Sequence, residues 1–333
     1  MAISQTGRRY AMGIRMNEEN IMVSINCITY NQEKYISDAI ESFLMQKTHF
    51  KYEILIHDDA SSDDTVNIIK KYEEQYPDII KPVYEKENQY SKGIKVLSEN
   101  SGRARGKYIA ICEGDDFWND PYKLQKQADY LEAHPECSLC VHAAYTVNSH
   151  NKRLRYKVRP RRSNGIVSIE ETIYGGGGVF ATNSMMYPNK LHGTFPYFCD
   201  IAEKVGVDDY PLNIYLALKG TIYYMDEYMS TYRVGIPGSW SVVNAAYEKH
   251  LNITNCMMDM LEELNQYTNF KYNTIIIKTK QKIEIEFLLM HKKQKEILSL
   301  DYYHSIEVKT KLKILICRLL PWLQDLVMLI QYD

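Results

Sequence analysis

The chain has 333 residues, of which 45% are hydrophobic and 25% are charged, and its formal net charge at pH 7 is −2. This length is enough for one large domain with an appendage, and the composition is typical of a soluble enzyme. Because a nucleic-acid-binding protein usually carries an excess of cations, the near-neutral charge gives no reason to expect nucleic acid as a partner.

Neither a targeting signal nor a disulfide framework is expected. Residues 1–20 are polar and charged and lack the apolar segment of a signal peptide, so we expect a leader outside the folded domain. The seven cysteines are scattered, and Cys137 and Cys140 lack the second pair or the histidines of a zinc site. Buried thiols in a reducing cytoplasm are the expected state.

Three short apolar segments, at residues 21–28, 54–56 and 108–111, are predicted to be buried β-strands. A helix is predicted over residues 35–46, because apolar side chains recur there with helical spacing, and another helix is predicted from Thr65. Strands and helices that alternate at this spacing predict a parallel α/β layer.

Each predicted strand ends in polar residues. They are Thr29, Tyr30 and Asn31 after the first strand, Asp58 and Asp59 after the second, and Glu113, Asp115 and Asp116 after the third. Ligands of parallel sheets bind where the carboxyl ends of the strands converge. Three carboxylates within four residues repel one another and resist ionisation unless a cation joins them. Mg²⁺ or Mn²⁺ bound together with a substrate phosphate would supply this cation. The alternative is that these acids form a turn that caps the next helix.

Three segments, residues 23–31, 57–63 and 106–116, together resemble the inverting family 2 nucleotide-sugar glycosyltransferases with the GT-A fold. The likeness covers roughly residues 20–235. It implies a Rossmann-like nucleotide-binding layer with a mixed, mostly parallel sheet. It also implies a nucleotide diphosphate sugar donor, usually UDP-linked, and a divalent metal, Mn²⁺ or Mg²⁺, at the family's Asp-x-Asp position, which is residues 113–115 here.

The resemblance also implies a role for individual residues. Thr29 and Tyr30 would border the base of the nucleotide, Asp59 would accept a hydrogen bond from the uracil ring, and Asp115 would hold the metal. The other positions implied to bind the nucleotide sugar are Asn31, Glu33, Glu113, Gly114 and Arg233. The chain departs from the family pattern at two of its positions, because Glu113 replaces an Asp and Gly235 stands where members often have a histidine.

Asp208 and Asp209 precede an apolar helix predicted over residues 212–218 and ended by Gly220. Two acids at this place can be explained as caps favoured by the helix dipole. The resemblance instead aligns them with an acidic pair whose second member, Asp209 here, is the catalytic base. Such a carboxylate takes the proton of the acceptor hydroxyl, while the metal neutralises charge on the departing diphosphate, and a single displacement inverts the anomeric carbon.

Two unusual stretches lie between these motifs. Residues 152–162 contain seven cations and no acid, which predicts either a solvated loop or a mobile flap that meets phosphates of the donor or acceptor. The four glycines at 175–178 predict either a flexible loop or a close approach of the backbone to a sugar.

The chain after residue 239 lies outside the resemblance and is predicted to be helical, over residues 247–264 and 274–300. Residues 309–330 are basic at the front and apolar behind, with Pro321 and Trp322. Two interpretations stay open for this tail. It lies on a membrane surface, with cations on anionic headgroups, or it packs on the catalytic domain or on a second subunit, which would make a homo-oligomer through the C-terminal helices.

The sequence therefore predicts a leader (1–20), a GT-A domain (21–238) and a helical C-terminal region (239–333). We expect a metal-dependent inverting transferase that moves a sugar from a UDP-sugar to a hydroxyl of a glycan or lipid-linked acceptor in bacterial surface polysaccharide synthesis, in the cytoplasm or on the inner face of the cell membrane. Two alternatives remain, a nucleotidyltransferase of sugar-nucleotide metabolism and a non-catalytic subunit of a glycosyltransferase complex. The first would need a Gly-rich, cation-bearing loop after the first strand, which residues 29–33 do not provide.

Overall fold

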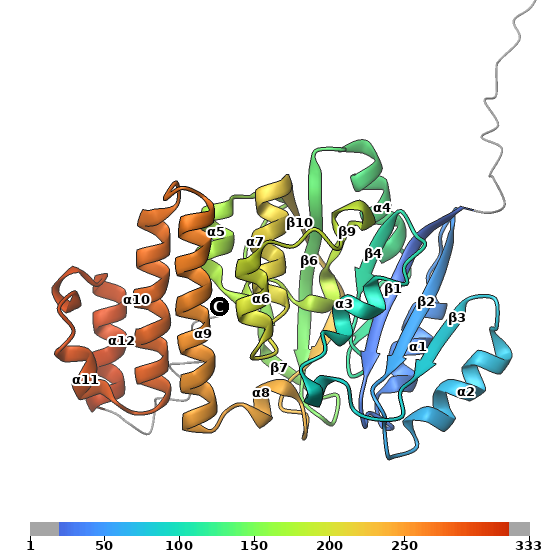
Figure 1. The fold of residues 1–333 in the computed structure, drawn as a ribbon, viewed down its shortest axis with the longest axis horizontal. Coiled ribbons are helices and arrows are strands. Elements are labelled where there is room, and N and C mark those ends of the chain that lie inside the picture. Colours follow the sequence, from blue (N-terminus) through green and yellow to red (C-terminus); the bar gives the residue numbers. More distant parts are fainter. Residues whose placement is uncertain (1–19, 320–333) are drawn as a thin grey trace, which may run out of the picture.

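The computed structural model describes residues 20–319, and a ten-stranded sheet runs through them (Figure 1). The strands are β1 (Ile21–Thr29), β2 (Lys51–Asp58), β3 (Ile80–Tyr84), β4 (Tyr108–Ile111), β5 (Phe117–Trp118), β6 (Cys137–Val147), β7 (Arg153–Val158), β8 (Gly165–Val167), β9 (Met186–Pro188) and β10 (Thr221–Arg233). Their order is β3-β2-β1-β4-β9-β6-β10-β5, with β7 added to β6 and β8 to β10. The predicted leader, apart from Asn20, lies outside the described residues.

The helices are α1 (Ile36–Leu44), α2 (Thr65–Gln75), α3 (Val96–Ser101), α4 (Lys123–Ala133), α5 (Ile169–Gly175), α6 (Tyr197–Glu203), α7 (Asp209–Lys219), α8 (Trp240–Val243), α9 (Tyr247–Tyr267), α10 (Asn273–Met290), α11 (Gln294–Leu298) and α12 (Val308–Leu319). The described residues also contain short 3₁₀ turns at η1 (Tyr90–Lys92), η2 (Gly177–Val179), η3 (Thr182–Ser184), η4 (Asn189–Leu191) and η5 (Tyr303–Ser305).

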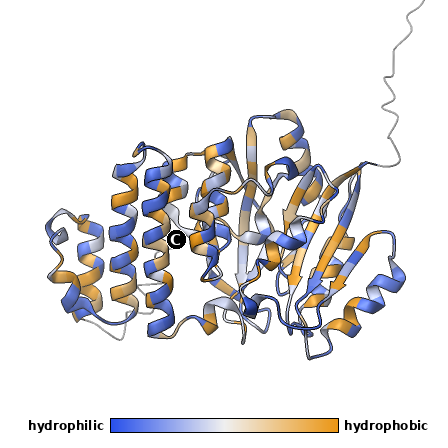
Figure 2. Ribbon diagram, viewed as in Figure 1, coloured by the Kyte–Doolittle hydropathy of each residue, from blue (hydrophilic) through white to orange (hydrophobic). Residues whose placement is uncertain are grey.

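The parallel layer predicted from the first strands is confirmed. β1 lies between β2 and β4 and is parallel to both, with Thr29 beside Asp58 and Asn26 beside Ile111. α1 covers one face of this layer through Ile36, Ile40 and Phe43, which are fully buried against the strands. Figure 2 shows hydrophobic residues concentrated along these strands. Because the three strands end at one edge, the polar residues that follow them are brought together there.

One expectation for the middle of the chain is wrong, and one strand there was not predicted. The basic stretch is neither a solvated loop nor a flap over residues 153–158, because it forms β7, antiparallel to β6. The structure also contains β10, which the sequence did not predict and which runs parallel to β6 over 13 residues. Asp226 and Glu227 interrupt the apolar pattern of β10 at a bulge between Met225 and Tyr228. A bulge reverses the inward and outward alternation, so a simple period of two is lost.

The C-terminal region is helical, as predicted, and continues the core of the sheet domain. Met257, Met260 and Leu261 of α9 are buried in the same cluster as residues of α6 and α7. The predicted helix over residues 274–300 is two helices, α10 and α11, because Lys292 takes a left-handed backbone with φ 59°. The expected domain boundary at residue 238 stays a prediction. Among residues 20–319, no helix combines the length and hydrophobicity needed to cross a membrane.

α12 packs on α10 and α11 through one face. Its Ile314 and Cys317 are buried in a small cluster with Phe287, Leu288 and Ile297. The described part of the tail therefore packs on protein, as one of the two interpretations expected. Pro321 and Trp322 lie outside the described residues.

A buried carboxylate fixes the strands at the edge opposite the polar residues. Glu53, at the start of β2, is 1% exposed and accepts hydrogen bonds from the Ser24 hydroxyl (2.7 Å) and from the Arg105 backbone N–H (2.9 Å) and Nε (2.8 Å). The Gly106 N–H donates to Ser24 Oγ (2.8 Å), and a Cβ at Gly106 would lie 2.5 Å from the Ser24 nitrogen. Glu53 thus joins β1, β2 and the approach to β4.

Replacement of Glu53 by Gln is expected to lower the free energy of unfolding by about 2 kcal/mol, because hydrogen bonds to a charged group each contribute about 1.5–3 kcal/mol. Burial alone would raise the pKa of Glu53, but the bonds from Arg105 and Ser24 outweigh it and hold the pKa below its ordinary value. The stabilisation is therefore present above the pKa of the unfolded carboxyl and is lost as pH falls through the lower folded pKa.

Urea unfolding of the wild type and Glu53→Gln at about pH 6 and about pH 3 measures both effects. The difference in stability between the two proteins should shrink at the lower pH. Glu74→Gln, at an exposed position of α2, is the matched control and should leave stability unchanged. Equal stability of wild type and Glu53→Gln at pH 6 would contradict this account.

Candidate active site

The loop after β1 is fastened to the loop after β2. Asn31 has φ 52°, a conformation that Asn tolerates better than most residues. Its side-chain oxygen accepts from the Ser62 N–H (2.7 Å), and its own N–H donates to Ser61 Oγ (2.8 Å). Glu33 accepts from the Asp64 N–H (3.0 Å). Asn31 and Glu33 therefore shape the loop, and their predicted contact with the nucleotide sugar stays a prediction.

Asp59 holds a second loop at the same edge. Its two carboxylate oxygens accept from the backbone N–H groups of Gln89 (2.6 Å) and Tyr90 (3.1 Å), so Asp59 fixes the segment that leads into η1. The neighbouring Asp58 is fully buried, and its Oδ1 has no hydrogen-bond partner among residues 20–319. Burial raises the pKa of Asp58. The uracil contact predicted for Asp59 is not tested by these bonds, since each oxygen keeps a second lone pair.

The turn after β4 packs tightly on the loop after β1. A Cβ at Gly114 would lie 2.5 Å from Gln32 Oε1 and 2.9 Å from Thr29 Oγ1, so only glycine fits without displacing these side chains. Thr29 Oγ1 donates to Gln32 Oε1 (2.7 Å), and the Gln32 side chain also hydrogen-bonds the Asp115 carboxylate. Gln32 thus links the loop after β1 to the acidic turn.

The three acids of this turn have different environments. Asp116 accepts from Asn183 Nδ2 (2.7 Å) and from the Arg233 N–H (2.7 Å), so both of its oxygens serve the fold. Glu113 Oε2 is buried and has no protein partner within the described part of the chain. Burial, followed by the charge of Asp115, raises the pKa of Glu113 to about 8. Burial also raises the pKa of Asp115.

These oxygens fit a divalent cation. Glu113 and Asp115 offer hard carboxylate oxygens, one of them orphaned, and a cation would relieve their mutual repulsion. No group of three His, Cys, Asp or Glu side chains in residues 20–319 is arranged to hold a metal. The remaining ligands would therefore have to be substrate oxygens and water, which is the usual arrangement for Mg²⁺ beside a phosphate.

Arg233, at the end of β10, lies inside the protein rather than on the surface of the site. Its side chain is fully buried, donates to Asn151 Oδ1 (3.0 Å) and also contacts the Asp115 carbonyl oxygen and the Asp38 carboxylate. The guanidinium lies 4.7 Å from the ring centroid of Phe117. The contact with a diphosphate predicted for Arg233 stays a prediction, because all of its visible partners belong to the protein.

Asp209 is the first residue of α7 and faces the glycine-rich segment. A Cβ at Gly177 would lie 3.4 Å from both carboxylate oxygens of Asp209, so the absence of a side chain there leaves room beside the acid. Burial raises the pKa of Asp209 to about 6. The charges of Asp209 and Asp208 also contribute to the raised pKa of Glu113, so both acids lie within electrostatic reach of the acidic turn.

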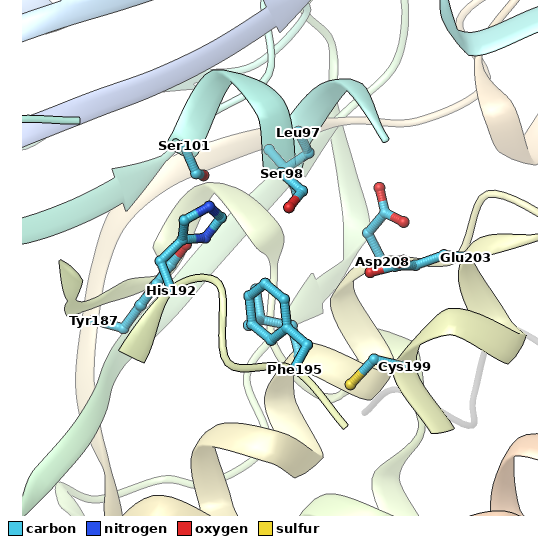
Figure 3. Close-up of a pocket in the computed structure, with 10 residues that line it drawn as sticks. Leu97, Ser98, Ser101, Tyr187, His192, Phe195, Cys199, Glu203 and Asp208 are labelled. Carbon is cyan, nitrogen blue, oxygen red and sulfur yellow. The ribbon is translucent and has the colours of Figure 1, made fainter. Parts of the chain in front are cut away.

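Asp208 points elsewhere. It lines a cavity of about 30 Å³, enough for about two water molecules, between α3, α6 and the start of α7. Figure 3 shows Asp208 and Glu203 on one side of this cavity, with His192 on the other. Burial, followed by the charges of Glu203 and Asp209, raises the pKa of Asp208 to about 7. The carboxylate of Asp209, by contrast, lies beside Gly177.

Three polar residues of the site were not among those predicted. Gln32 directly follows the first resembling segment and Tyr232 directly precedes Arg233, whereas Asn183 has no signal in the sequence. Asn183 donates to Asp116 and accepts from the Ser230 hydroxyl (2.6 Å). The pKa of Tyr232 is raised by burial and then by the charges of Asp116, Glu113, Asp115 and Asp209.

Comparison with known proteins shows the family and the fold of this chain. Residues 24–190 match the model of glycosyl transferase family 2. The uncharacterized protein Rv1520 of Mycobacterium tuberculosis is 35% identical over 220 residues, which are 66% of this chain and 60% of that protein. The Escherichia coli UDP-Glc:alpha-D-GlcNAc-diphosphoundecaprenol beta-1,3-glucosyltransferase WfaP is 36% identical over 112 residues, which are 33% of this chain and 41% of that protein.

Two solved structures share the fold. The mannosyltransferase PcManGT of Pyrobaculum calidifontis, in complex with GDP-Man and Mn²⁺, has a TM-score of 0.57 at 15% identity and covers 94% of this chain and 86% of its own. Residues 1–349 of Staphylococcus aureus TarS, in complex with UDP-GlcNAc, have a TM-score of 0.53 at 18% identity and cover 88% of this chain and 90% of their own. The GT-A fold predicted from the sequence is confirmed, and the chain belongs to glycosyl transferase family 2.

Proposed function

We propose that this chain transfers a sugar, with inversion, from a nucleotide diphosphate sugar to a hydroxyl group of a glycan or lipid-linked acceptor in surface polysaccharide synthesis, and that the donor is a UDP-sugar. The observation that carries the proposal is the separation of two kinds of carboxylate. Glu113 and Asp115 lie on a turn at the sheet edge, whereas Asp209 lies on α7 beside Gly177. Family membership favours this reaction over nucleotidyl transfer.

Glu113 and Asp115 would hold a divalent metal, which would supply positive charge to the departing diphosphate. Gln32 keeps the Asp115 carboxylate oriented, and the Arg233 guanidinium fixes the backbone of the turn. Thr29, Tyr30, Asn31, Glu33, Asp59 and Gly114 would form the nucleotide side of the site. The solved complex of PcManGT, which shares the fold, contains both GDP-Man and Mn²⁺ and so supports a nucleotide sugar and a divalent metal for this chain.

Asp209 would act on the acceptor. The acceptor oxygen attacks the anomeric carbon, the bond from that carbon to the diphosphate oxygen breaks, and the hydroxyl proton passes to an Asp209 carboxylate oxygen. A pKa of about 6 suits a base that works near neutral pH. The name of WfaP specifies UDP-Glc and an acceptor linked to diphosphoundecaprenol. It therefore supports a UDP-sugar donor and a lipid-linked acceptor for this chain.

Metal and nucleotide are expected to bind together. Calorimetry should show that UDP binds the wild type at least tenfold more tightly with Mn²⁺ or Mg²⁺ than with a chelator, and that Asp115→Asn removes this difference. Asp78→Asn, at an exposed position remote in sequence from the turn, should behave as the wild type. Equal UDP affinity with and without metal would count against the metal assignment.

Loss of the base should slow the reaction without weakening the donor complex. Asp209→Asn is expected to release UDP from a UDP-sugar roughly 100-fold more slowly, with UDP affinity close to that of the wild type. Asp208→Asn, which alters the adjacent cavity, should cost much less. In the wild type, kcat/KM should rise through about pH 6, because deprotonation of Asp209 creates the active base.

The rate of UDP release tests both the assignment of Asp209 as the base and the alternative that the chain is a non-catalytic subunit. Normal turnover by Asp209→Asn would move the base to another residue. A wild-type chain that releases no UDP from any member of a panel of UDP-sugars, with any acceptor, would favour a non-catalytic subunit.

The outward face of α12 supports association with a membrane surface. Val308, Leu312, Leu315 and Leu319 are 81%, 55%, 47% and 66% exposed, and their spacing places them on one stripe of the helix, opposite the buried Ile314 and Cys317. The exposed cations Lys309 and Arg318 flank this stripe. An apolar stripe beside cations fits the interface of an anionic bilayer, where a lipid-linked acceptor would be found.

The triple change Val308→Ser, Leu312→Ser and Leu315→Ser is expected to weaken binding to vesicles of anionic lipid at least tenfold, because each buried apolar side chain contributes about 1.5–3 kcal/mol. Sedimentation at two salt concentrations measures it, and Ile166→Ser with Val242→Ser, two exposed apolar residues elsewhere, is the control. A wild type that binds no vesicles at low salt, or a dimer that the triple change makes monomeric, would contradict the proposal.

A further inference from the structure

The basic strand β7 has an exposed row of cations that the proposed chemistry does not use. Arg153, Arg155 and Lys157 alternate with the inward Leu154 and Val158, so the three cations lie on one face of the strand. Within residues 20–319, none of the three pairs with a carboxylate, whereas the adjoining Arg159 and Arg161 pair with Asp226 and Glu171.

Aromatic rings hold two of these three cations, Arg153 and Lys157, in place. The rings of Tyr145 and Tyr228 stack with centroids 4.3 Å apart. The Arg153 guanidinium lies 4.0 Å from the Tyr145 centroid, and Lys157 Nζ lies 5.3 Å from the Tyr228 centroid. Cation–π contacts of this kind orient long side chains and leave their outer N–H groups free to donate. Two acids of β10, the strand on the other side of β6, are engaged elsewhere, Asp226 with Arg159 and Glu227 with Lys126.

The row begins next to the candidate active site. Val147, the last residue of β6, lies between Arg153 of β7 and Arg233 of β10 in the sheet register. Asn151, in the turn before β7, accepts a hydrogen bond from Arg233 Nε, and Arg233 in turn contacts the Asp115 carbonyl oxygen. In Figure 1, β7 lies at the lower edge of the molecule, beside the end of β6. The cations therefore extend outward from the acidic turn.

From these contacts we infer that β7 is a track for the acceptor, and that the acceptor is an anionic glycan with phosphate or carboxylate groups at repeated positions. The inference rests on the proposed glycosyl transfer. Three cations at two-residue intervals span roughly 13 Å, a length that suits several successive anions better than one diphosphate. Charge complementarity at an exposed surface contributes modestly for each pair, so several pairs are needed for useful affinity.

Nucleic acid and membrane fit this surface less well. The rings of Tyr145 and Tyr228 already stack on each other and carry cations, so they offer no free platform for the bases of single-stranded RNA. The outward positions of β7 carry no apolar side chain that could insert into a bilayer. A sugar chain with repeated charges needs neither a free aromatic ring nor an inserting apolar side chain.

The test compares the full-length wild type with two variants that each lose three positive charges. One is Arg153→Gln with Arg155→Gln and Lys157→Gln, and the control is Lys71→Gln with Lys278→Gln and Lys295→Gln, at exposed positions on other elements. The probes are an oligogalacturonate, inorganic polyphosphate, a neutral maltooligosaccharide, poly(U) RNA and anionic vesicles. UDP affinity with Mn²⁺ is measured on the same samples.

The wild type should bind at least one of the two anionic chains, and should not bind the neutral one. The β7 variant should bind that chain at least tenfold more weakly, with a smaller salt dependence, and the control should match the wild type. Equal binding by the β7 variant, no binding of either anionic chain by the wild type, or an equal loss of affinity for poly(U) or for vesicles would overturn the inference. Unchanged UDP affinity in that case would leave the proposed function standing, whereas a wild type that fails to bind UDP would fail the function itself.

Discussion

The buried guanidinium of Arg233 is the interaction on which the site depends. A fully buried cation is tolerated only when its N–H groups are matched by acceptors, and here the acceptors come from three separate segments. Asp38 belongs to α1, the Asp115 carbonyl to the acidic turn, and Asn151 to the turn between β6 and β7. The backbone N–H of the same residue also donates to Asp116. Arg233 thus fixes the position of the acidic turn relative to α1 and to the turn between β6 and β7.

This arrangement explains why the acids of the turn divide into two roles. Asp116 faces Asn183 and the Arg233 backbone and is satisfied by the protein, so its charge is absorbed by the fold. Glu113 and Asp115 receive fewer hydrogen bonds from the protein than Asp116 does. Their pKa values are raised because it is unfavourable to hold a negative charge in a buried position without a counterion. The protein therefore supplies the frame for a cation and leaves the neutralisation to the cation and the substrate. Gln32 and Gly114 complete the frame, because one orients Asp115 and the other lets the two loops touch.

Much of this layer could be predicted from the sequence. Apolar runs that end in polar residues are a local signal, and parallel strands bring such ends to one edge whatever lies between them. The order of the motifs then predicted the family and the fold. The partners of the site residues could not be predicted in the same way. Asn183 contacts Asp116 across 67 positions of sequence, and Arg233 contacts Asp38 across 195, and no local pattern encodes such distances.

The wrong prediction of a loop at β7 has a different origin. The sequence there does contain a local strand pattern, but the high density of cations favoured a loop. Residues 153–158 alternate strictly between cations and the apolar Leu154, Tyr156 and Val158, which is the period of a strand with one face in the core. Seven cations in eleven residues suggested a loop, since charge density usually marks solvent. A strand at the edge of a sheet can carry that density on its outer face, and such charges also discourage pairing with another chain. The spacing of the few apolar residues therefore decides that this segment is a strand. The dense charge indicates only which face of the strand meets solvent or a charged ligand.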